Sequence, residues 1–200
     1  MNQIENASLR TVNPAAPVAV TAPFRFRTWL ARVGRLFPRN SQTDTVATLM
    51  DLAASPEAVW ERILFYEEVP KRPARLLKMF LPPPVSTEGD KTKIGGLVHC
   101  LYEDGDLVKR ITNLEPPRLM EFEVLEQHLG VEDCVATTDG SYSIRATPGG
   151  SEVALTTRYH GHLRPRRMWR PLERYLAHQV HRHILEGMRA ALGGGAGATS

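Results

Sequence analysis

The chain has 200 residues, 42% of them hydrophobic, which suits one domain with a sizeable core plus extensions. No stretch reaches the roughly 18 apolar residues of a membrane-spanning helix, and the mild apolar run at 15–22 lacks the basic start of a signal peptide. The two cysteines, Cys100 and Cys134, have the spacing of neither a disulfide scaffold nor a metal pair. We therefore expect free thiols in a reducing, cytoplasmic setting, with no metal and no cofactor.

The net charge of +3 conceals an asymmetry along the chain. Residues 1–44 hold six arginines and two acidic residues, and residues 164–200 hold seven arginines and two glutamates. The stretch between them holds twelve basic and eighteen acidic residues. Because the basic character belongs to the two ends, we do not expect the central domain to bind nucleic acid.

Residues 1–44 are predicted to be a disordered extension that carries one basic amphipathic helix at 24–39. Apolar residues recur there at helical spacing, and most arginines lie off that stripe. Such a helix is typical of the interface of an anionic membrane. The candidate membrane contacts are Trp29, Arg25, Arg32 and Arg35. The alternatives are a helix packed on the domain's own surface and a lid over a cavity.

The predicted domain spans 45–192 and begins with a strand at 45–54, where apolar and polar residues alternate. Ser55 is a good N-cap, Pro56 fits the first helical position and Glu57 suits the positive end of a helix, so a helix follows and ends at Pro70. A second short helix is predicted at 71–81. The prolines at 82–84 prevent its continuation.

The periodicity then changes from helical to alternating, and short strands are separated by turn signals rich in Gly and Pro. This pattern predicts an antiparallel meander with strands at 97–103, 107–114, 119–127, 140–146 and 152–160. Alternation sends Glu121 and Glu123 to the solvated side of their strand, opposite Met120, Phe122 and Val124.

A long helix is predicted at 165–192, with a kink or restart at Pro171, and residues 193–200 form a flexible tail. Its apolar face contains Leu172, Tyr175, Leu176, Val180, Ile184, Gly187 and Met188. The fold class is therefore α+β, a curved antiparallel sheet wrapped on a long C-terminal helix with two short helices. A sheet curved around one helix leaves room for an apolar ligand.

Three segments carry a resemblance to a known superfamily: LAASPEAVWERILFYEEVP (52–70), GGLVHCLYEDGDLVKRITNLEPPRLMEFEV (95–124) and GSYSIRATPGGSEVALTTRYHGHLRPRRMWRPLERYLAHQVHRHIL (140–185). From Met50 to Met188 the chain resembles the SRPBCC superfamily of Bet v 1, START and polyketide cyclase/dehydrase-type proteins. These are structural signatures, and none of them is a catalytic motif. The resemblance implies a helix-grip fold with a cavity for a hydrophobic ligand, and it leaves the ligand open.

The C-terminal helix supplies the first candidate site residues. His183 and, at the edge of the stripe, Gln179 are expected to face the cavity, where His183 would bind a ligand or act as a general base. The alternative is a structural histidine satisfied by a strand residue. His178 and His181 are expected to point away from the stripe, and their spacing with the strand histidines does not make a metal site.

The strands supply the remaining candidates. Tyrosine hydroxyls in a cavity often fix the polar end of an apolar ligand, but alternation alone does not decide which face of each strand is concave. The candidate ligand contacts are Tyr102, Tyr142, Tyr159, Met120, Phe122 and Val124 from the strands, with Leu176 and Val180 from the helix.

Three functions are consistent with these observations. The first is a non-catalytic binder or carrier of a lipid, isoprenoid or polyketide-like molecule, favoured because no catalytic constellation assembles. The second is a polyketide cyclase or dehydratase that uses a cavity His or Tyr. The third is a peripheral membrane module that docks through 24–39 and through the arginines around Trp169. The sequence does not indicate an oligomeric state.

Overall fold

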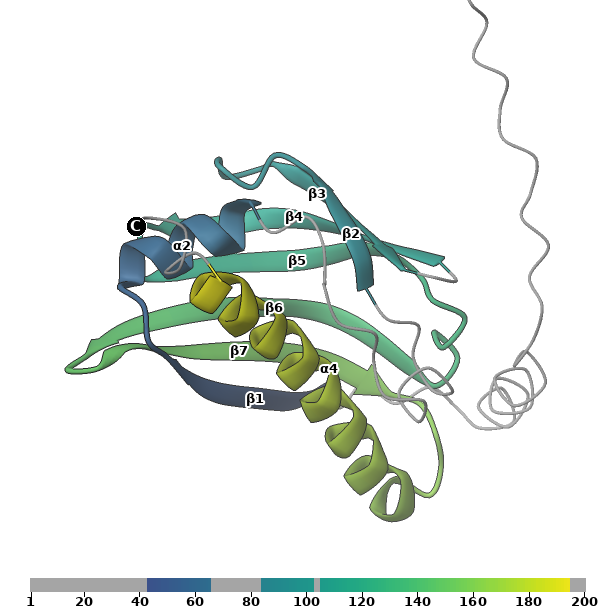
Figure 1. The fold of residues 1–200 in the computed structure, drawn as a ribbon. Helices are drawn as coiled ribbons and strands as arrows, with labels where there is room; N and C mark the ends of the chain where they lie inside the picture. Colours follow the sequence, from purple (N-terminus) through teal and green to yellow (C-terminus); the bar gives the residue numbers. More distant parts are fainter. Residues whose placement is uncertain (1–42, 66–83, 103–104, 195–200) are drawn as a thin grey trace, which may run out of the picture.

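The computed structural model describes residues 43–65, 84–102 and 105–194. Within these ranges, one antiparallel sheet has the strand order β1-β7-β6-β5-β4-β3-β2, and two helices lie against it (Figure 1). The elements are β1 (Thr43–Leu52), α2 (Pro56–Phe65), β2 (Pro84–Gly89), β3 (Leu97–Tyr102), β4 (Gly105–Glu115), β5 (Leu119–His128), β6 (Val135–Thr147), β7 (Gly150–Gly161) and α4 (Arg166–Gly194). The strands from β2 to β7 pair in chain order, and β1 pairs with β7 at the far edge.

Strands β1 and β7 each present one face to the helices, as the alternating sequence predicts. In β1, Val46 and Thr48 are buried while their neighbours are exposed, and in β7 the same alternation buries Val153, Leu155 and Tyr159. An antiparallel sheet with one covered face requires this two-residue period. The predicted antiparallel meander and α+β class are therefore confirmed.

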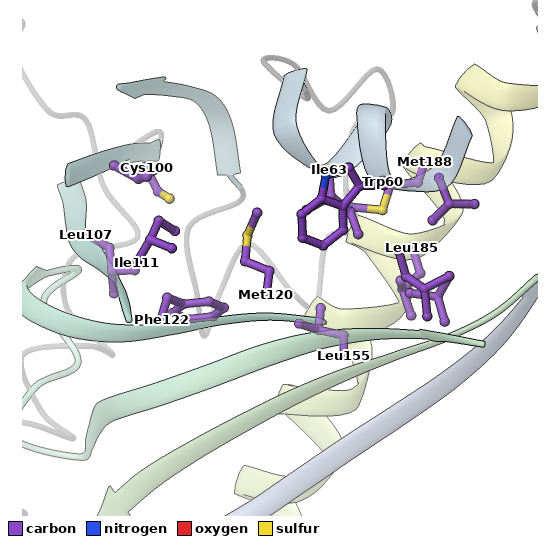
Figure 2. Packing of buried hydrophobic residues seen from close by; sticks show 14 of the residues in the cluster. Trp60, Ile63, Cys100, Leu107, Ile111, Met120, Phe122, Leu155, Leu185 and Met188 are labelled. Carbon is purple, nitrogen blue, oxygen red and sulfur yellow. The ribbon is translucent and has the colours of Figure 1, made fainter. Parts of the chain in front are cut away.

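Helix α4 has two parts with different surroundings. Its C-terminal half contacts α2 in the hydrophobic core, where Leu185 and Met188 lie near Trp60 and Ile63, with Met120 beside them (Figure 2). The N-terminal half extends past α2 and crosses the sheet with no other described helix beside it (Figure 1). The tight packing at one end fixes the helix, and its other end covers the part of the sheet face that α2 does not reach.

The start of α2 follows the predicted capping chemistry. The Ser55 hydroxyl accepts a hydrogen bond from the backbone N–H of Ala58 at 3.3 Å, and Pro56 and Glu57 occupy the first turn. Helix α4 continues through Pro171 and does not restart there. Pro171 removes one backbone donor within the first two turns of α4.

Several expectations differ from the structure or lie beyond it. Strand β2 has no counterpart in the sequence prediction, which takes Pro84, the first residue of the strand, only as a helix breaker. Strand β6 begins at Val135, five residues before the predicted strand. The helices predicted at 24–39 and 71–81 lie outside the described residues. In the described part of the chain, no helix is both long and apolar enough to cross a membrane.

Ser151 ties the sheet to the segment that leads into α2. Its side chain is fully buried, and its hydroxyl donates a hydrogen bond to the Ala54 carbonyl at 2.7 Å. Ser151→Ala leaves that carbonyl without its partner, so we expect the free energy of unfolding to fall by about 1–2 kcal/mol in urea melts. Ser143→Ala, at an exposed position of neighbouring β6, is the control and should stay within about 0.5 kcal/mol of wild type.

Candidate functional site

A cavity of about 180 Å³ lies between the N-terminal half of α4 and the covered face of the sheet. Side chains from α4 and from β3 to β7 line it, and its wall is mostly apolar. A second hollow of about 60 Å³ lies beside it toward α2. The two hollows share Lys109, Phe122 and Tyr142 as a common wall.

Most of the candidate ligand contacts lie on this cavity. Those that line it are Tyr102, Phe122, Val124, Tyr142, Tyr159, Leu176 and Val180. Met120 lines the smaller hollow as part of the core. His183 and Gln179 line neither of the two hollows, so the expectation that they face the cavity is wrong.

The histidine that lines the cavity is His181. The sequence prediction had His181 pointing away from the apolar stripe of the helix. His181 is 3% exposed, its Nδ1 lies 3.0 Å from the Thr48 hydroxyl and its Nε2 lies 2.8 Å from the Thr157 hydroxyl. His178 also reaches the Thr48 hydroxyl, at 2.8 Å. Burial, with the neighbouring His178 and Lys109, lowers the pKa of His181 to about 4. His181 is therefore a neutral ring held between two strands.

The predictions for His183 and His181 are both wrong because α4 is rotated about its axis relative to the predicted orientation. The buried face follows Glu173, His181, Leu185 and Met188, which have helical spacing, whereas Tyr175 is 49% exposed. Because Glu173 and His181 on this face are polar, a stripe drawn through apolar residues alone omits them and is centred nearer His183 than His181. Leu185 and Met188 follow His181 by four and seven residues, and this helical spacing is the signal in the sequence that places His181 on the buried face.

One end of the cavity gathers Lys109, Tyr102 and Tyr142. The Lys109 ammonium lies 4.4 Å from the centroid of the Phe122 ring, which supplies a cation–π contact. Burial opposes the charge of Lys109, but its interactions with Cys100 and Tyr102 leave its pKa above the ordinary value. Burial raises the pKa of both tyrosines well above the ordinary value, so they are neutral phenols. This end therefore offers a cation and two hydroxyls to a ligand.

The other end rests on a buried cluster of charges. Arg166 places its Nη2 2.6 Å from Asp44 Oδ2 and its Nη1 2.6 Å from Glu173 Oε1, and Arg170 approaches Asp44 Oδ1 at 2.6 Å. Tyr159 lines the cavity beside this cluster. In the sequence, Asp44 belongs to the predicted extension and Arg166 to an arginine-rich helix start. The cluster is not predictable from either segment, because it forms only when β1 and α4 meet.

Trp169 completes this end of the cavity. It lies half-buried on the cavity wall, and its Nε1 donates a hydrogen bond to the Arg164 carbonyl at 3.0 Å. In the described residues, no three His, Cys, Asp or Glu side chains are grouped as metal ligands.

A family model described as polyketide cyclase/dehydrase and lipid transport matches residues 43–194. The chain belongs to this family. The match extends from the first residue of β1 to the last residue of α4, so it includes every element that lines the cavity. No curated protein matches the chain.

Solved structures share the fold of this chain. An aromatase/cyclase from a Streptomyces species has a TM-score of 0.53 at 16% identity, covering 75% of this chain and 93% of that one. A protein from Mesorhizobium loti gives 0.51 at 16%, covering 74% and 96%. A protein from Thermus thermophilus gives 0.51 at 15%, covering 74% and 95%. At this identity the likeness establishes the helix-grip fold of the polyketide cyclase/dehydrase and lipid-transport family.

Proposed function

We propose that this chain binds an apolar small molecule in the cavity under α4 and carries it reversibly. The observation that carries the proposal is the cavity itself, about 180 Å³ with a mostly apolar wall and polar groups gathered at its two ends. Ligand sites in proteins have this character: apolar surface supplies affinity and a few polar atoms fix orientation. The family's description, which includes lipid transport, supports the same conclusion.

The state of His181 favours binding over catalysis. A general base acts best when its pKa lies near the working pH, and the pKa of His181 is lowered to about 4. Both of its ring nitrogens also lie within hydrogen-bond distance of threonine hydroxyls, which hold the ring in place. His183, the general base predicted from the sequence, is not among the residues that line the cavity.

The second candidate function is a cyclase or dehydratase, and the observation that favours it is the Lys109 end of the cavity. A half-buried cation beside two phenol donors stabilises an enolate or another oxyanion. The same groups equally hold the polar end of a ligand that is only carried. Turnover of an aromatic polyketide precursor that Lys109→Met abolishes, with the precursor still bound, would favour the enzyme.

Filling the cavity tests the carrier proposal. Ala177 lines the cavity on α4, so Ala177→Phe places a ring where the ligand would lie. Native mass spectrometry of the purified full chain should show a co-purifying apolar molecule in wild type and little in the variant. Calorimetric titration with naphthalene should show at least a tenfold loss of affinity.

The matched control is Ala190→Phe, an exposed position on the same helix, which should bind naphthalene as wild type does. Thermal melts establish that both variants fold. A folded Ala177→Phe protein that keeps the wild-type affinity would refute binding in this cavity.

A further inference from the structure

Two buried polar atoms near the cavity have no hydrogen-bond partner in the part of the chain that the structure describes. The Tyr159 hydroxyl and the second carboxylate oxygen of Glu173, Oε2, are buried, and among the described residues neither has a hydrogen-bond partner. Their residues are 2% and 6% exposed, and both line the cavity. Folded proteins rarely leave such atoms unpaired, so each calls for a partner that the described residues do not supply.

The charge cluster fixes the Glu173 carboxylate in this arrangement. One terminal nitrogen of Arg166 pairs with Oε1 of Glu173, and the other pairs with Asp44. The Oε2 atom of Glu173 is therefore the carboxylate oxygen that Arg166 does not contact. Gly161 makes room for the guanidinium, because a Cβ there would lie 2.1 Å from Arg166 Nη1. Backbone and side chains thus hold the carboxylate with one oxygen unused beside the cavity.

The protonation states set which ligand group fits the pair. Burial, with the negative charges of Glu173 and Asp44, raises the pKa of Tyr159 to about 12, so its hydroxyl stays protonated and donates. The Glu173 carboxylate, ion-paired with Arg166, accepts. A single ligand group that serves both must accept one hydrogen bond and donate another. A hydroxyl does both, a ketone or ether only accepts, and a carboxylate would meet the negative charge of Glu173.

We propose that Tyr159 and Glu173 form a subsite for a hydroxyl group, and that the ligand is an apolar alcohol or phenol. The inference rests on the proposed function and specifies its ligand class. Tyr159 donates to the ligand oxygen, and the ligand hydroxyl donates to Glu173 Oε2. The apolar body of the ligand then lies along Leu176, Val180 and Ile184 toward Phe122.

The test compares two probes that differ only in the donor. 2-Naphthol has a hydroxyl, and 2-methoxynaphthalene has the same ring system with an oxygen that only accepts. Calorimetric titration of the full chain at pH 7 gives both dissociation constants. Wild type should prefer 2-naphthol by roughly tenfold, the size expected for a hydrogen bond to a charged acceptor.

Two variants assign the preference to the pair. Tyr159→Phe keeps the ring and removes a hydroxyl that has no partner among the described residues, so its melting temperature should not fall while its affinity for 2-naphthol drops several-fold. Glu173→Gln removes the charged acceptor and should bring the ratio of the two constants close to one. Tyr175→Phe, at an exposed position on the same helix, should keep the wild-type ratio.

The outcomes separate this inference from the proposed function. If wild type binds both probes equally well, the cavity takes apolar molecules and the hydroxyl subsite is refuted. If a tenfold preference persists in both variants, the discrimination arises elsewhere and the assignment to Tyr159 and Glu173 fails. If neither probe nor naphthalene binds, the carrier proposal falls and the subsite falls with it.

Discussion

Arg166→Ala is expected to lower the free energy of unfolding by about 3–5 kcal/mol, because it removes the partner of buried carboxylates. Asp44 and Glu173 have side chains only 3% and 5% exposed, and each lies 2.6 Å from an Arg166 nitrogen. Asp44 keeps Arg170, but the described residues offer Glu173 no second ion-pair partner. Chemical denaturation followed by circular dichroism measures the loss.

An exposed ion pair of the same length provides the control. Arg110 and Glu123 lie 2.7 Å apart on the open face of the sheet, with side chains 46% and 42% exposed. Water screens this pair, so Arg110→Ala should cost less than about 1 kcal/mol. If the two variants lost the same stability, the Arg166 cluster would not behave as a buried one. Added salt should weaken only the exposed pair appreciably.

The order of elements was predictable because local rules decide it. The alternation in 152–160 places Val153, Leu155 and Tyr159 on one face of the strand, and the structure buries that face. The Ser55-Pro56-Glu57 start predicts the beginning of α2. Both signals follow from neighbours in the chain, namely side-chain direction in a strand and the unpaired donors at a helix start. The superfamily resemblance agrees with the family match over 43–194.

The polar side of the cavity was not predictable because its partners are distant in sequence. His181 is buried since Thr48 and Thr157 meet its two nitrogens, and Thr48 lies 133 residues away. Glu173 is buried since Arg166 neutralises it within a cluster that β1 completes through Asp44. Hydrophobic periodicity assigns both residues to the surface. The prediction therefore placed His183 and Tyr175 on the buried face of α4. Buried polar residues require partners, and only the assembled fold identifies them.

The pH dependence of stability gives the second large effect, and its origin is His181. Burial and the charges of His178 and Lys109 lower its pKa to about 4, against 6.5 for the ordinary histidine. Between these values the unfolded chain binds the proton and the folded chain does not, so the contribution is present in full above pH 6.5 and is lost as the pH falls toward 4. The loss amounts to about 3 kcal/mol.

His181→Gln isolates this contribution. Glutamine has a donor and an acceptor for the Thr48 and Thr157 hydroxyls but does not titrate, so the variant should lose stability less steeply between pH 6.5 and 4. Burial also lowers the pKa of His183, which acts in the same direction in both proteins, so the difference between their urea-melt profiles belongs to His181. His99→Gln, at an exposed position of β3, should keep the slope that His181 produces. Parallel profiles for wild type and His181→Gln would mean that His181 does not stay neutral in the fold, and would remove the argument that it is a structural ring.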